Sequence, residues 1–516
     1  MEPQHGRTES VWMRDGIAMP ESAAIPDDAV ADVCVVGAGI AGLTTAYLLA
    51  RSGKSVIVLD QGHIGGGETE RTTAHLSNAI DAGYIKIERL HGREGARLAA
   101  ESHSAAIDTI ERIVRSERLE CDFHRMDGYL FAARPEDRYT LDEELAAAQR
   151  AGLSGVEHVA RAPLNGFDTG PCLRFPRQAQ FHPIKYLAGI ARAYKREGGR
   201  LFTHTHVTSI AGGRPAKIDT ASGRIVTADR VVVATNTPIN DLVAIHTKQM
   251  AYRTYAIGAL IARGSVTPAL FWDTGNPYHY IRLQPHDQTY DVLIVGGEDH
   301  KTGQADDMNA RYARLIDWTR QRVHHVGPVA FQWSGQVMEP VDGLAYIGQN
   351  PGDENVFIVT GDSGMGMTHG TIAGLLLRDL ILDRPNPWAG LYDPARKRLR
   401  AAMEYAAENL NTAVQYADWL GGSDTPSIAA IPPGSGAIVR DGLTKLAVYR
   451  DPDGALHTRS AVCPHLSCIV HWNPGEQTWD CPCHGSRFDP YGRVVNGPAM
   501  SDLAETEHAP NAPSVG

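Results

Sequence analysis

Two short stretches near the end of the chain contain residues that could do chemistry: CPHLSC at 463–468 and CPCHGS at 481–486. Together they place four of the seven cysteines within 21 residues, beside two histidines. Such residues make a disulfide staple, a zinc site or the cage of a redox cluster. The first residues, MEPQHGRTESVWMRDG, lack the apolar core of a secretory signal, so we expect a cytoplasmic protein. In that compartment a cysteine cluster more often binds a metal than forms a structural disulfide.

The spacing distinguishes the two metal sites. Each stretch contributes one cysteine and one histidine, as Cys463-x-His465 and Cys481-x-x-His484, whereas a zinc finger groups like residues together. Two thiolates and two imidazoles are the ligands of a Rieske [2Fe–2S] centre. The chain also resembles the Rieske family over residues 430–505, including NGPA at 496–499. We therefore predict a Rieske cluster on Cys463, His465, Cys481 and His484, with zinc as the alternative.

The other two cysteines of these stretches are Cys468 and Cys483. Resemblance to Rieske proteins of the cytochrome bc type implies a disulfide between them that ties the cluster loops together; otherwise they are small core residues. Ser486 stands where high-potential members place a hydroxyl, but Phe488 replaces their tyrosine. We expect a potential below the bc-type proteins and above oxygenase-type centres. The remaining three, Cys34, Cys121 and Cys172, are isolated and read as ordinary thiols.

A second site begins at GAGIAG, residues 37–42. The motif follows a β-rich run at 30–36 and opens a helical stretch at 41–52, and a second strand signal ends at Asp60, 18 residues past Gly42. Gly37 permits the tight turn, Gly39 lets the backbone approach a pyrophosphate, and Gly42 lets the helix pack on the strand. An acid at Asp60 can accept ribose hydroxyls. The context favours a dinucleotide site over a chance glycine turn.

A later glycine-rich junction, VFIVTGDSGMGMTHG at 356–370, favours FAD over NAD, because the flavin ring lies far from the adenine. Here the chain resembles the FAD-dependent D-amino-acid-oxidase-like family, which includes glycine, sarcosine and gamma-glutamylputrescine oxidases. The resemblance covers residues 30–400. It is carried by GAGIAGL (37–43), VIVLDQ (56–61), GETERTTAHLS (67–77), HPIKYL (182–187), VTSI (207–210), VVVATN (231–236), DGLAYIG (342–348) and the 361–370 loop.

This resemblance assigns residues to FAD. It implies that the segment from Arg71 to Leu76 passes near the flavin or its phosphates, with Val207 near the adenine. The full predicted set is Gly37, Gly39, Ile40, Ala41, Gly42, Asp60, Gln61, Arg71, Thr72, Thr73, Ala74, His75, Leu76, Val207, Ala234, Thr235, Gly361, Gly364, Gly366, Met367 and Thr368. Some family members attach the flavin covalently through Cys or His. His75 is the one candidate here, although a hydrogen-bonding or packing role is the simpler interpretation.

Candidate substrate residues lie in the region expected to form the substrate domain. Tyr252, Tyr255, Tyr278, Tyr280 and Arg282 stand out there. Arg282 could hold a substrate carboxylate bidentately or be an ordinary arginine on a sheet face; with Tyr255 and Tyr280 it is a weak catalytic candidate, and we name no base. Glu298, Asp299 and His300 could border the flavin face or form a solvated loop. A mononuclear iron site is disfavoured because the close pairs, His204 with His206 and His324 with His325, lack H-x₄-H spacing.

Composition and length set the organisation. The 516 residues are 43% hydrophobic and 21% charged with a net charge of -11, which indicates a multidomain globular protein and argues against nucleic acid as a partner. No apolar run is suited to span a membrane. We expect an N-terminal arm (1–29), an oxidoreductase region (30–420), a Gly/Pro/Ser-rich linker (421–437) and a Rieske domain (438–516). Helices are expected near 92–118, 183–197 and 371–382.

The predicted fold class is an α/β Rossmann-type FAD-binding domain interleaved with an α+β substrate domain, followed by a small all-β Rieske domain. The resemblance implies oxidation of a C–N bond in an amine or amino acid, such as an N-methylated amino acid or a gamma-glutamyl amine. We expect electrons to pass from flavin to cluster and on to an external acceptor, which could be a protein, a quinone or oxygen. The alternatives are a flavin reductase or monooxygenase fed through the cluster, and a non-enzymatic redox carrier or sensor.

Overall fold

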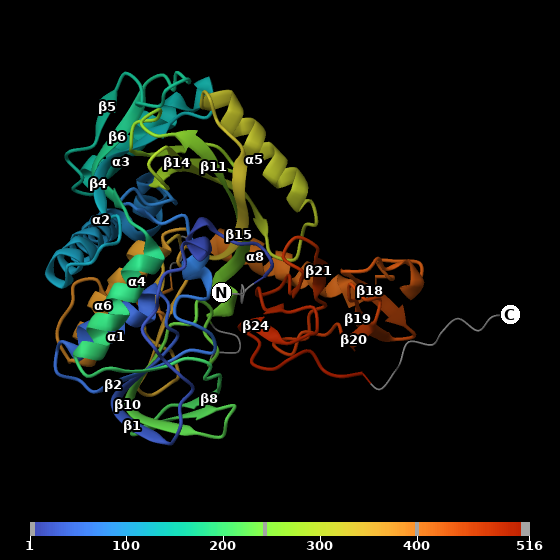
Figure 1. Cartoon of the computed structure of the whole chain (residues 1–516). Coiled ribbons are helices and arrows are strands. Elements are labelled where there is room, and N and C mark those ends of the chain that lie inside the picture. Colours follow the sequence, from blue (N-terminus) through green and yellow to red (C-terminus); the bar gives the residue numbers. More distant parts are fainter. Residues whose placement is uncertain (1–5, 241–244, 398–401, 420, 507–516) are drawn as a thin grey trace.

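The computed structural model describes residues 6–240, 245–397, 402–419 and 421–506. A large two-sheet body occupies most of the chain, and the C-terminal residues form a smaller all-β body against one side of it (Figure 1). No helix in the described part of the chain is long and apolar enough to cross a membrane. The cytoplasmic location stays a prediction.

The first sheet of the large body has eight strands, and its central pairs are parallel. Its strands are β1 (Ala29–Val36), β2 (Val56–Leu59), β7 (Arg200–Phe202), β8 (Val207–Ala211), β9 (Ala216–Thr220), β10 (Ile225–Val233), β16 (Tyr346–Gln349) and β17 (Val356–Thr360). Runs of buried valine and isoleucine build these strands, because both faces of the sheet are covered: helices pack on one face, and Ile25 with β8 and β9 covers the other. Packed on it are α1 (Ile40–Ala50), α4 (Pro183–Arg196) and α6 (Gly366–Ile381).

The second sheet has nine strands and is mostly antiparallel. It consists of β3 (His75–Leu76), β4 (His124–Phe131), β5 (Glu157–Val159), β6 (Cys172–Gln180), β11 (Gln249–Ala262), β12 (Leu270–Asp273), β13 (His279–Pro285), β14 (Tyr290–Lys301) and β15 (Val329–Pro340). Helices α2 (Tyr84–Glu117), α3 (Arg138–Arg150), α5 (Met308–Arg322) and the short α7 (Ala389–Tyr392) complete the body. The chain passes repeatedly between the two sheets, so the domains interleave. The three expected helices are α2, α4 and α6; the backbone of α2 is non-helical at Gly92 (φ 75°, ψ 173°), and the helix expected near 92–118 is the part of α2 after this kink.

The C-terminal body contains two small antiparallel sheets. The first is β18 (Ser435–Asp441), β19 (Thr444–Arg450) and β20 (Leu456–Ser460); the second is β21 (His471–Asn473), β22 (Thr478–Asp480), β23 (Arg487–Phe488) and β24 (Val494–Asn496). The stretch expected to be a linker, 421–437, is partly built into this body. The Asp424 amide donates to Ile438 O at 2.8 Å, and β18 begins inside the stretch at Ser435.

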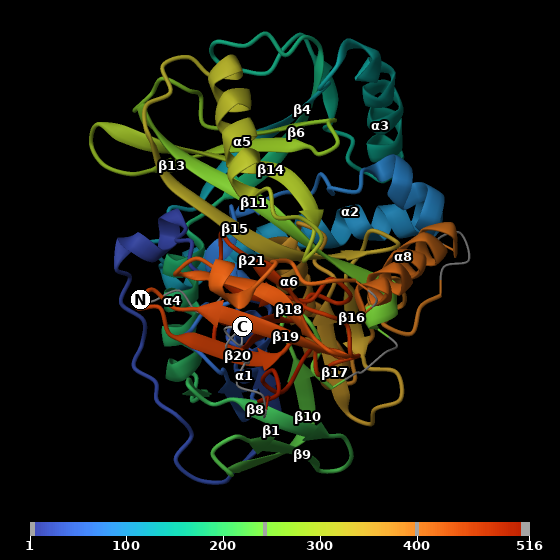
Figure 2. The same cartoon turned by 90° about the vertical axis from the view of Figure 1, so that its right-hand side faces the viewer.

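Segments at both ends of the oxidoreductase region pack against the C-terminal body (Figure 2). Helix α8 (Ala402–Gln415) leads into a 3-10 turn (Tyr416–Trp419), where Tyr416 Oη donates to Leu466 O at 2.7 Å. At the N-terminus, the Thr8 hydroxyl donates to Glu476 Oε1 at 2.6 Å, and Trp12 is 1% exposed. The part of the expected arm that the structure describes is therefore partly buried: residues 6–8 contact Glu476 and Arg71, and Trp12 packs against His182 of the large body.

Candidate functional site

The glycine turn between β1 and α1 has the geometry that its motif predicts. Gly37 has φ 108°, and a Cβ there would lie 2.4 Å from Ala234 O. A Cβ on Gly42 would lie 1.9 Å from Gly37 O, so the helix can pack here only without a side chain. Asp60 accepts hydrogen bonds from the amides of Ala38 at 2.6 Å and Gly62 at 2.8 Å. The turn therefore opens the N-terminus of α1 toward a cavity that a dinucleotide phosphate fits.

This cavity extends from the glycine turn to the second sheet. Most of the residues predicted to bind FAD line it: Gly37, Gly39, Ile40, Ala41, Asp60, Gln61, Arg71, Thr72, Thr73, His75, Val207, Ala234, Thr235, Gly364, Gly366 and Met367. The other five predicted residues lie outside the lining of the cavity: Gly42, Ala74, Leu76, Gly361 and Thr368. They act through packing: a Cβ on Gly361 would meet Pro340 at 2.7 Å, and Thr368 Oγ1 bonds Met365 O and His103 Nδ1.

His75 lines the cavity on β3. Its Nδ1 lies 3.2 Å from Thr73 Oγ1, and its ring packs edge-on against Tyr280 with centroids 5.3 Å apart. Burial, and then the charge of Arg282, lower the pKa of His75 to about 3, so the imidazole is neutral near pH 7. These contacts are those of the packed, hydrogen-bonding histidine that the sequence favours, and the role of His75 at the cofactor stays a prediction.

Arg282 and Tyr255 lie outside the lining of the cavity, unlike Tyr280. The Arg282 guanidinium is fully buried and donates to the backbone carbonyls of Thr73, Ala74 and Phe181 and to Gln284. The suggestion that Arg282 holds a substrate carboxylate is therefore wrong for this conformation, since its terminal nitrogens brace the segment that carries His75. Tyr255 Oη lies 2.8 Å from His300 Nε2 on the far side of the sheet.

The substrate-sheet end of the cavity is acidic. Asp81, Asp299 and Glu339 line it together with Thr254, Tyr278 and Tyr280. Tyr278 Oη donates to Asp81 at 3.1 Å, and the Ser363 hydroxyl donates to Glu339 at 2.7 Å. Asp299 Oδ1 is buried and has no hydrogen-bond partner among the described residues.

The pKa values reflect this crowding of carboxylates. Enclosure by protein, and then Glu339, raise the pKa of Asp81 to about 8. Burial raises the pKa of Asp299 to about 7; Thr254 opposes the shift and Glu339 adds to it. Among the described residues that line the cavity, Arg71 is the only arginine or lysine, and its terminal nitrogens are turned toward Glu476, Ser334 and the N-terminal segment. The acidic end thus has no cationic side chain of its own on the wall.

Sequence reasoning mentioned Asp299 but missed Asp81 and Glu339. Asp81 follows the family motif at 67–77 by only four residues, and Glu339 lies three residues before the matched DGLAYIG segment. Position next to these motifs was the available signal. Neither position shows that the two carboxylates meet, because Asp81 precedes α2 and Glu339 is on β15.

The cysteine-rich loops converge in the C-terminal body. In each loop the carbonyl of the first cysteine accepts a hydrogen bond from the amide four residues later. Ser467 N donates to Cys463 O, and Gly485 N donates to Cys481 O. Cys463 and Cys481 are both buried and lie within hydrogen-bonding reach of each other. The His465 and His484 rings stand 5.0 Å apart. The four predicted ligands are therefore brought together, two from each loop.

A disulfide joins Cys468 and Cys483, whose Cα atoms are 6.4 Å apart. Among the described residues, Cys468, Cys481 and Cys483 also form a group of metal-binding side-chain types whose sulfur atoms all lie within 4.8 Å of one another. Since two of these three sulfurs are bonded to each other, that group cannot supply three thiolates. Two free thiols and two imidazoles remain, which matches the donors of a Rieske [2Fe–2S] centre.

The surroundings of these donors fit the cluster. His484 Nδ1 is buried with no hydrogen-bond partner among the described residues. Burial, and then His465 and His246, lower the pKa of His484 to about 3, which favours the neutral imidazole that binds metals. The contact with Cys481, and more weakly a Ser486 hydrogen bond, lower the pKa of Cys463. Phe488 is fully buried in the core of this body.

The histidine edge of the cluster loops faces the large body. The His246 ring packs against His465 at 4.9 Å and His484 at 6.0 Å between centroids. Gln336, which lines the cavity from β15, donates from Nε2 to Gly485 O at 2.9 Å. Gly485 directly follows His484. One side chain therefore connects the cavity wall to a cluster loop, and neither His246 nor Gln336 was identified from the sequence.

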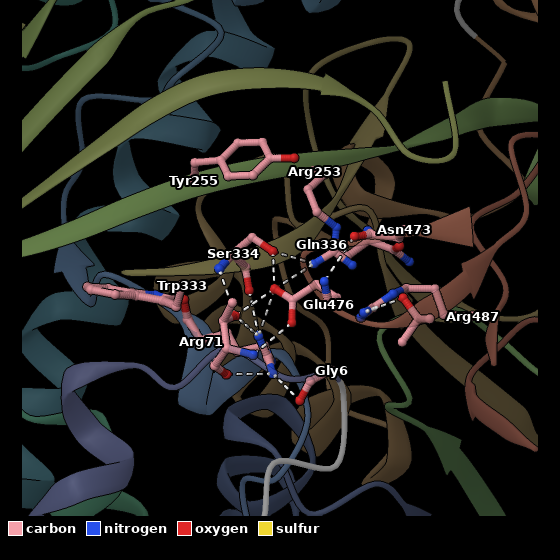
Figure 3. Close-up of polar contacts among 12 residues, drawn as sticks. Gly6, Arg71, Arg253, Tyr255, Trp333, Ser334, Gln336, Asn473, Glu476 and Arg487 are labelled. Atoms are coloured by element: carbon pink, nitrogen blue, oxygen red, sulfur yellow. Dashed lines mark hydrogen bonds and ion pairs between the residues drawn. The ribbon is translucent and has the colours of Figure 1, made fainter. Parts of the chain in front are cut away.

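A buried ion network joins the two bodies (Figure 3). Glu476 Oε1 lies 3.5 Å from Arg71 and 3.9 Å from Arg253, and it accepts from the Ser334 hydroxyl. Asp480 pairs with Arg487 at 3.3 Å and Arg253 at 4.0 Å. Burial alone would raise the pKa of Glu476, but Arg71, Arg253 and Arg487 bring it down to about 2. Such a network stabilises a docked arrangement only while its charges are matched.

Comparison with known proteins matches both bodies. Residues 32–380 match the family model described as FAD dependent oxidoreductase, and residues 428–507 match the Rieske [2Fe-2S] domain. These matches confirm the predicted fold class, the resemblance to both families, and the two cofactors, FAD and a Rieske cluster.

Two curated relatives and one solved structure give the scale of the similarity. YhfW of Bacillus subtilis (strain 168), whose name describes a Rieske 2Fe-2S iron-sulfur protein, is 28% identical over 511 residues and covers 97% of both chains. Gamma-glutamylputrescine oxidoreductase of Escherichia coli (strain K12) is 27% identical over 68% of this chain and 83% of its own. The crystal structure of glycine oxidase from Geobacillus kaustophilus superposes with a TM-score of 0.58 at 17% identity, covering 72% of this chain and 99% of that one.

Proposed function

Because the chain belongs to the FAD-dependent oxidoreductase family and carries a C-terminal Rieske domain, we propose that it oxidises the C–N bond of a cationic amine and passes the electrons through the Rieske cluster to an external acceptor. The observation that carries the proposal is the single cavity, which has the dinucleotide turn at one end, carboxylates at the other, and a wall in contact with a cluster loop. Bound FAD supplies a two-electron acceptor, and the cluster supplies a one-electron acceptor.

The acidic end of the cavity supports an amine as the substrate. In their ionised forms Asp81, Asp299 and Glu339 would attract an ammonium group and repel a carboxylate, and a bound ammonium group would in turn lower their raised pKa values. The faces of Tyr278 and Tyr280, whose centroids are 5.5 Å apart, offer a further surface for a cation. A diamine suits this arrangement, because one nitrogen can be neutral at the reacting carbon while the other is held as an ammonium ion. The similarity to gamma-glutamylputrescine oxidoreductase supports the amine class.

The reaction balances without oxygen. The amine loses two electrons and two protons to become an imine, and water then hydrolyses the imine to an aldehyde and ammonia, or a smaller amine. The two electrons leave one at a time, reducing two equivalents of a one-electron acceptor. The role of the chain is to position the amine, exclude bulk water and hold the charge of the distant nitrogen.

The contact between Gln336 and Gly485 supports an internal electron route. It runs from the wall of the cavity to the backbone beside His484 through one hydrogen bond of 2.9 Å. Gln336 is 2% exposed, so this route is shielded from solvent. The acceptor beyond the cluster is external and would be a protein, a quinone or another redox partner.

An anaerobic experiment tests this function. The holoenzyme is mixed with diamines, with monoamines of equal length and with ω-amino acids, while flavin absorbance and the electron paramagnetic resonance of the reduced cluster are followed. We expect a diamine to bleach the flavin and then produce the cluster signal. The double variant Cys463→Ser, Cys481→Ser should keep flavin bleaching and lose the cluster signal and acceptor turnover. Cys172→Ser, a buried thiol in β6 outside the cluster loops, is the control.

Normal acceptor turnover by the double variant would rule out the relay. If no amine or amino acid bleaches a flavin that dithionite can reduce, the amine function is wrong. If only ω-amino acids bleach the flavin, oxidation of a C–N bond is supported and the preference for a cationic amine is wrong.

A further inference from the structure

The C-terminal body contributes part of the wall of the FAD cavity. Five residues of its 494–500 segment line that cavity: Val494, Asn496, Gly497, Ala499 and Met500. They come from β24 and the turn after it, more than a hundred residues beyond α6, the last element of the large body to line the cavity. The family model for the oxidoreductase ends at residue 380, so these contacts lie outside it.

The contacts of this segment place it along the dinucleotide half of the cavity. Gln61, next to Asp60 at the end of β2, donates from Nε2 to Val495 O at 3.2 Å. The Oε1 atom of the same Gln61 accepts a hydrogen bond from His206 Nδ1 at 3.0 Å, beside Val207. A Cβ on Gly497 would lie 3.2 Å from Ile239, just after the end of β10. The segment therefore covers the region between the ends of β2 and β10, away from the acidic pocket.

Asn496 is the residue of this segment with the clearest unmet requirement. It is 4% exposed, and its Nδ2 has no hydrogen-bond partner among the described residues. A buried amide donor without an acceptor is costly, so native structures rarely keep one unless a ligand or water accepts the bond. Since Asn496 lines the cavity, the natural acceptor is an oxygen or nitrogen of the dinucleotide.

The segment is held in place from its own side. Asn496 pairs with Arg487 in the sheet that joins β24 to β23. The Ala499 amide donates to Ser486 Oγ at 3.0 Å, next to the cluster ligand His484. Arg487 in turn belongs to the buried ion network that docks the two bodies. The position of Asn496 thus depends on both the cluster loop and the docking network.

We propose that the Rieske domain completes the FAD site: its 494–500 segment closes the dinucleotide half of the cavity, and Asn496 donates a hydrogen bond to the bound cofactor. FAD then enters or leaves only when the Rieske domain has lifted from the large body. FAD binding and docking of the Rieske domain stabilise each other, because the contacts between the 494–500 segment and FAD form only in the docked state. This inference depends on the FAD site alone and is independent of which substrate is oxidised.

The test measures FAD release from the purified holoenzyme by the fluorescence of free flavin, with the cluster signal recorded in parallel. We expect Asn496→Ala to release FAD about tenfold faster, which is the effect of losing one hydrogen bond of typical strength. Asn496→Asp keeps the size but loses the donor, and should release FAD at least as fast. Arg493→Gln, at an exposed position just before β24, should leave release unchanged.

A second variant acts on docking from outside the cavity. Glu476 does not line the cavity but pairs with Arg71, which does, so faster FAD release by Glu476→Gln supports the proposal only where proteolysis also detects loosening of the domain. Limited proteolysis reports the loosening independently. The proposal is overturned if Asn496→Ala keeps both the cluster signal and the wild-type release rate. It is equally overturned if Glu476→Gln becomes protease-sensitive, with its cluster signal intact, and still releases FAD at the wild-type rate.

Discussion

Glu476 offers the sharpest test of how the two bodies are held together. Glutamine at this position keeps the shape of the side chain and removes its charge, while Arg71, Arg253 and Arg487 stay buried around it. The network lowers the pKa of Glu476 from 4.5 to about 2. At about 1.4 kcal/mol for each pKa unit, the charged form gains about 3 kcal/mol. Removing one partner of a buried ion pair costs about 3–5 kcal/mol, so we expect Glu476→Gln to lose about 3 kcal/mol of stability at pH 7.

The contribution of Glu476 to stability should also depend on pH. Because the pKa of Glu476 is depressed in the folded protein, its contribution is fully present above 4.5 and is lost as pH falls toward 2. The difference in stability between wild type and Glu476→Gln should therefore be largest near neutral pH. It should shrink steadily below 4.5, where the wild-type carboxylate also becomes neutral.

Urea unfolding, followed by tryptophan fluorescence and by proteolysis of the C-terminal body, measures this difference. A matched control is Glu505→Gln in the same body, where the carboxylate pairs with Arg459 at 2.7 Å but is 88% exposed. An exposed pair of this kind is worth up to about 1 kcal/mol. If Glu476→Gln is no less stable than Glu505→Gln, or if its deficit is the same at pH 3 and pH 7, the charge of Glu476 does not hold the domains together.

Three further predictions address the cavity and the cluster. Asp299→Asn should raise the diamine KM about tenfold, the effect of one charge-assisted hydrogen bond. Since the pKa of Asp299 is about 7, the wild-type rise of kcat/KM with pH near 7 should flatten in the variant. Asp291→Asn, at the other end of β14, should behave as wild type. Gln336→Ala should leave substrate bleaching of the flavin intact and slow the appearance of the cluster signal in stopped-flow and freeze-quench traces. The control is Gln332→Ala, at an exposed position on the same strand. Equal rates of cluster reduction in the two variants would exclude the hydrogen-bonded route. The double variant Cys468→Ser, Cys483→Ser should lower the stability of the C-terminal body by about 3 kcal/mol, from a closed loop of 15 residues, with the cluster still assembled; wild-type stability in urea would show that the disulfide contributes little.

Local sequence was informative wherever function depends on the chain's own neighbours. The glycine turn at Gly37 is such a case, since a tight turn and a close helix contact leave no room for a Cβ. The cluster loops are another, because each supplies one cysteine and one histidine from within four residues. The assignment of individual residues to FAD rested on resemblance, and the lining of the cavity includes most of the residues assigned that way.

Residues that act across the sheets were not predictable in the same way. Arg282 is the clearest example: its type suits a substrate carboxylate, yet its guanidinium is used to brace the backbone near His75. The stretch 421–437 is another, because Gly, Pro and Ser favour a linker while the fold recruits its last three residues into β18. In both cases tertiary contacts override a preference that the residue type alone supports.

The sequence by itself determined the two cofactors, the order of the domains and the residues of the two binding motifs, because these depend on residue types a few positions apart. Tertiary structure alone decided how the two centres face each other. It brought Asp81, Asp299 and Glu339 into one acidic pocket, placed Glu476 among three arginines, and put Asn496 into the wall of a cavity whose glycine turn lies at residue 37. Charges and hydrogen bonds act over a few ångströms in space, and separation along the chain does not reveal which residues come within that range.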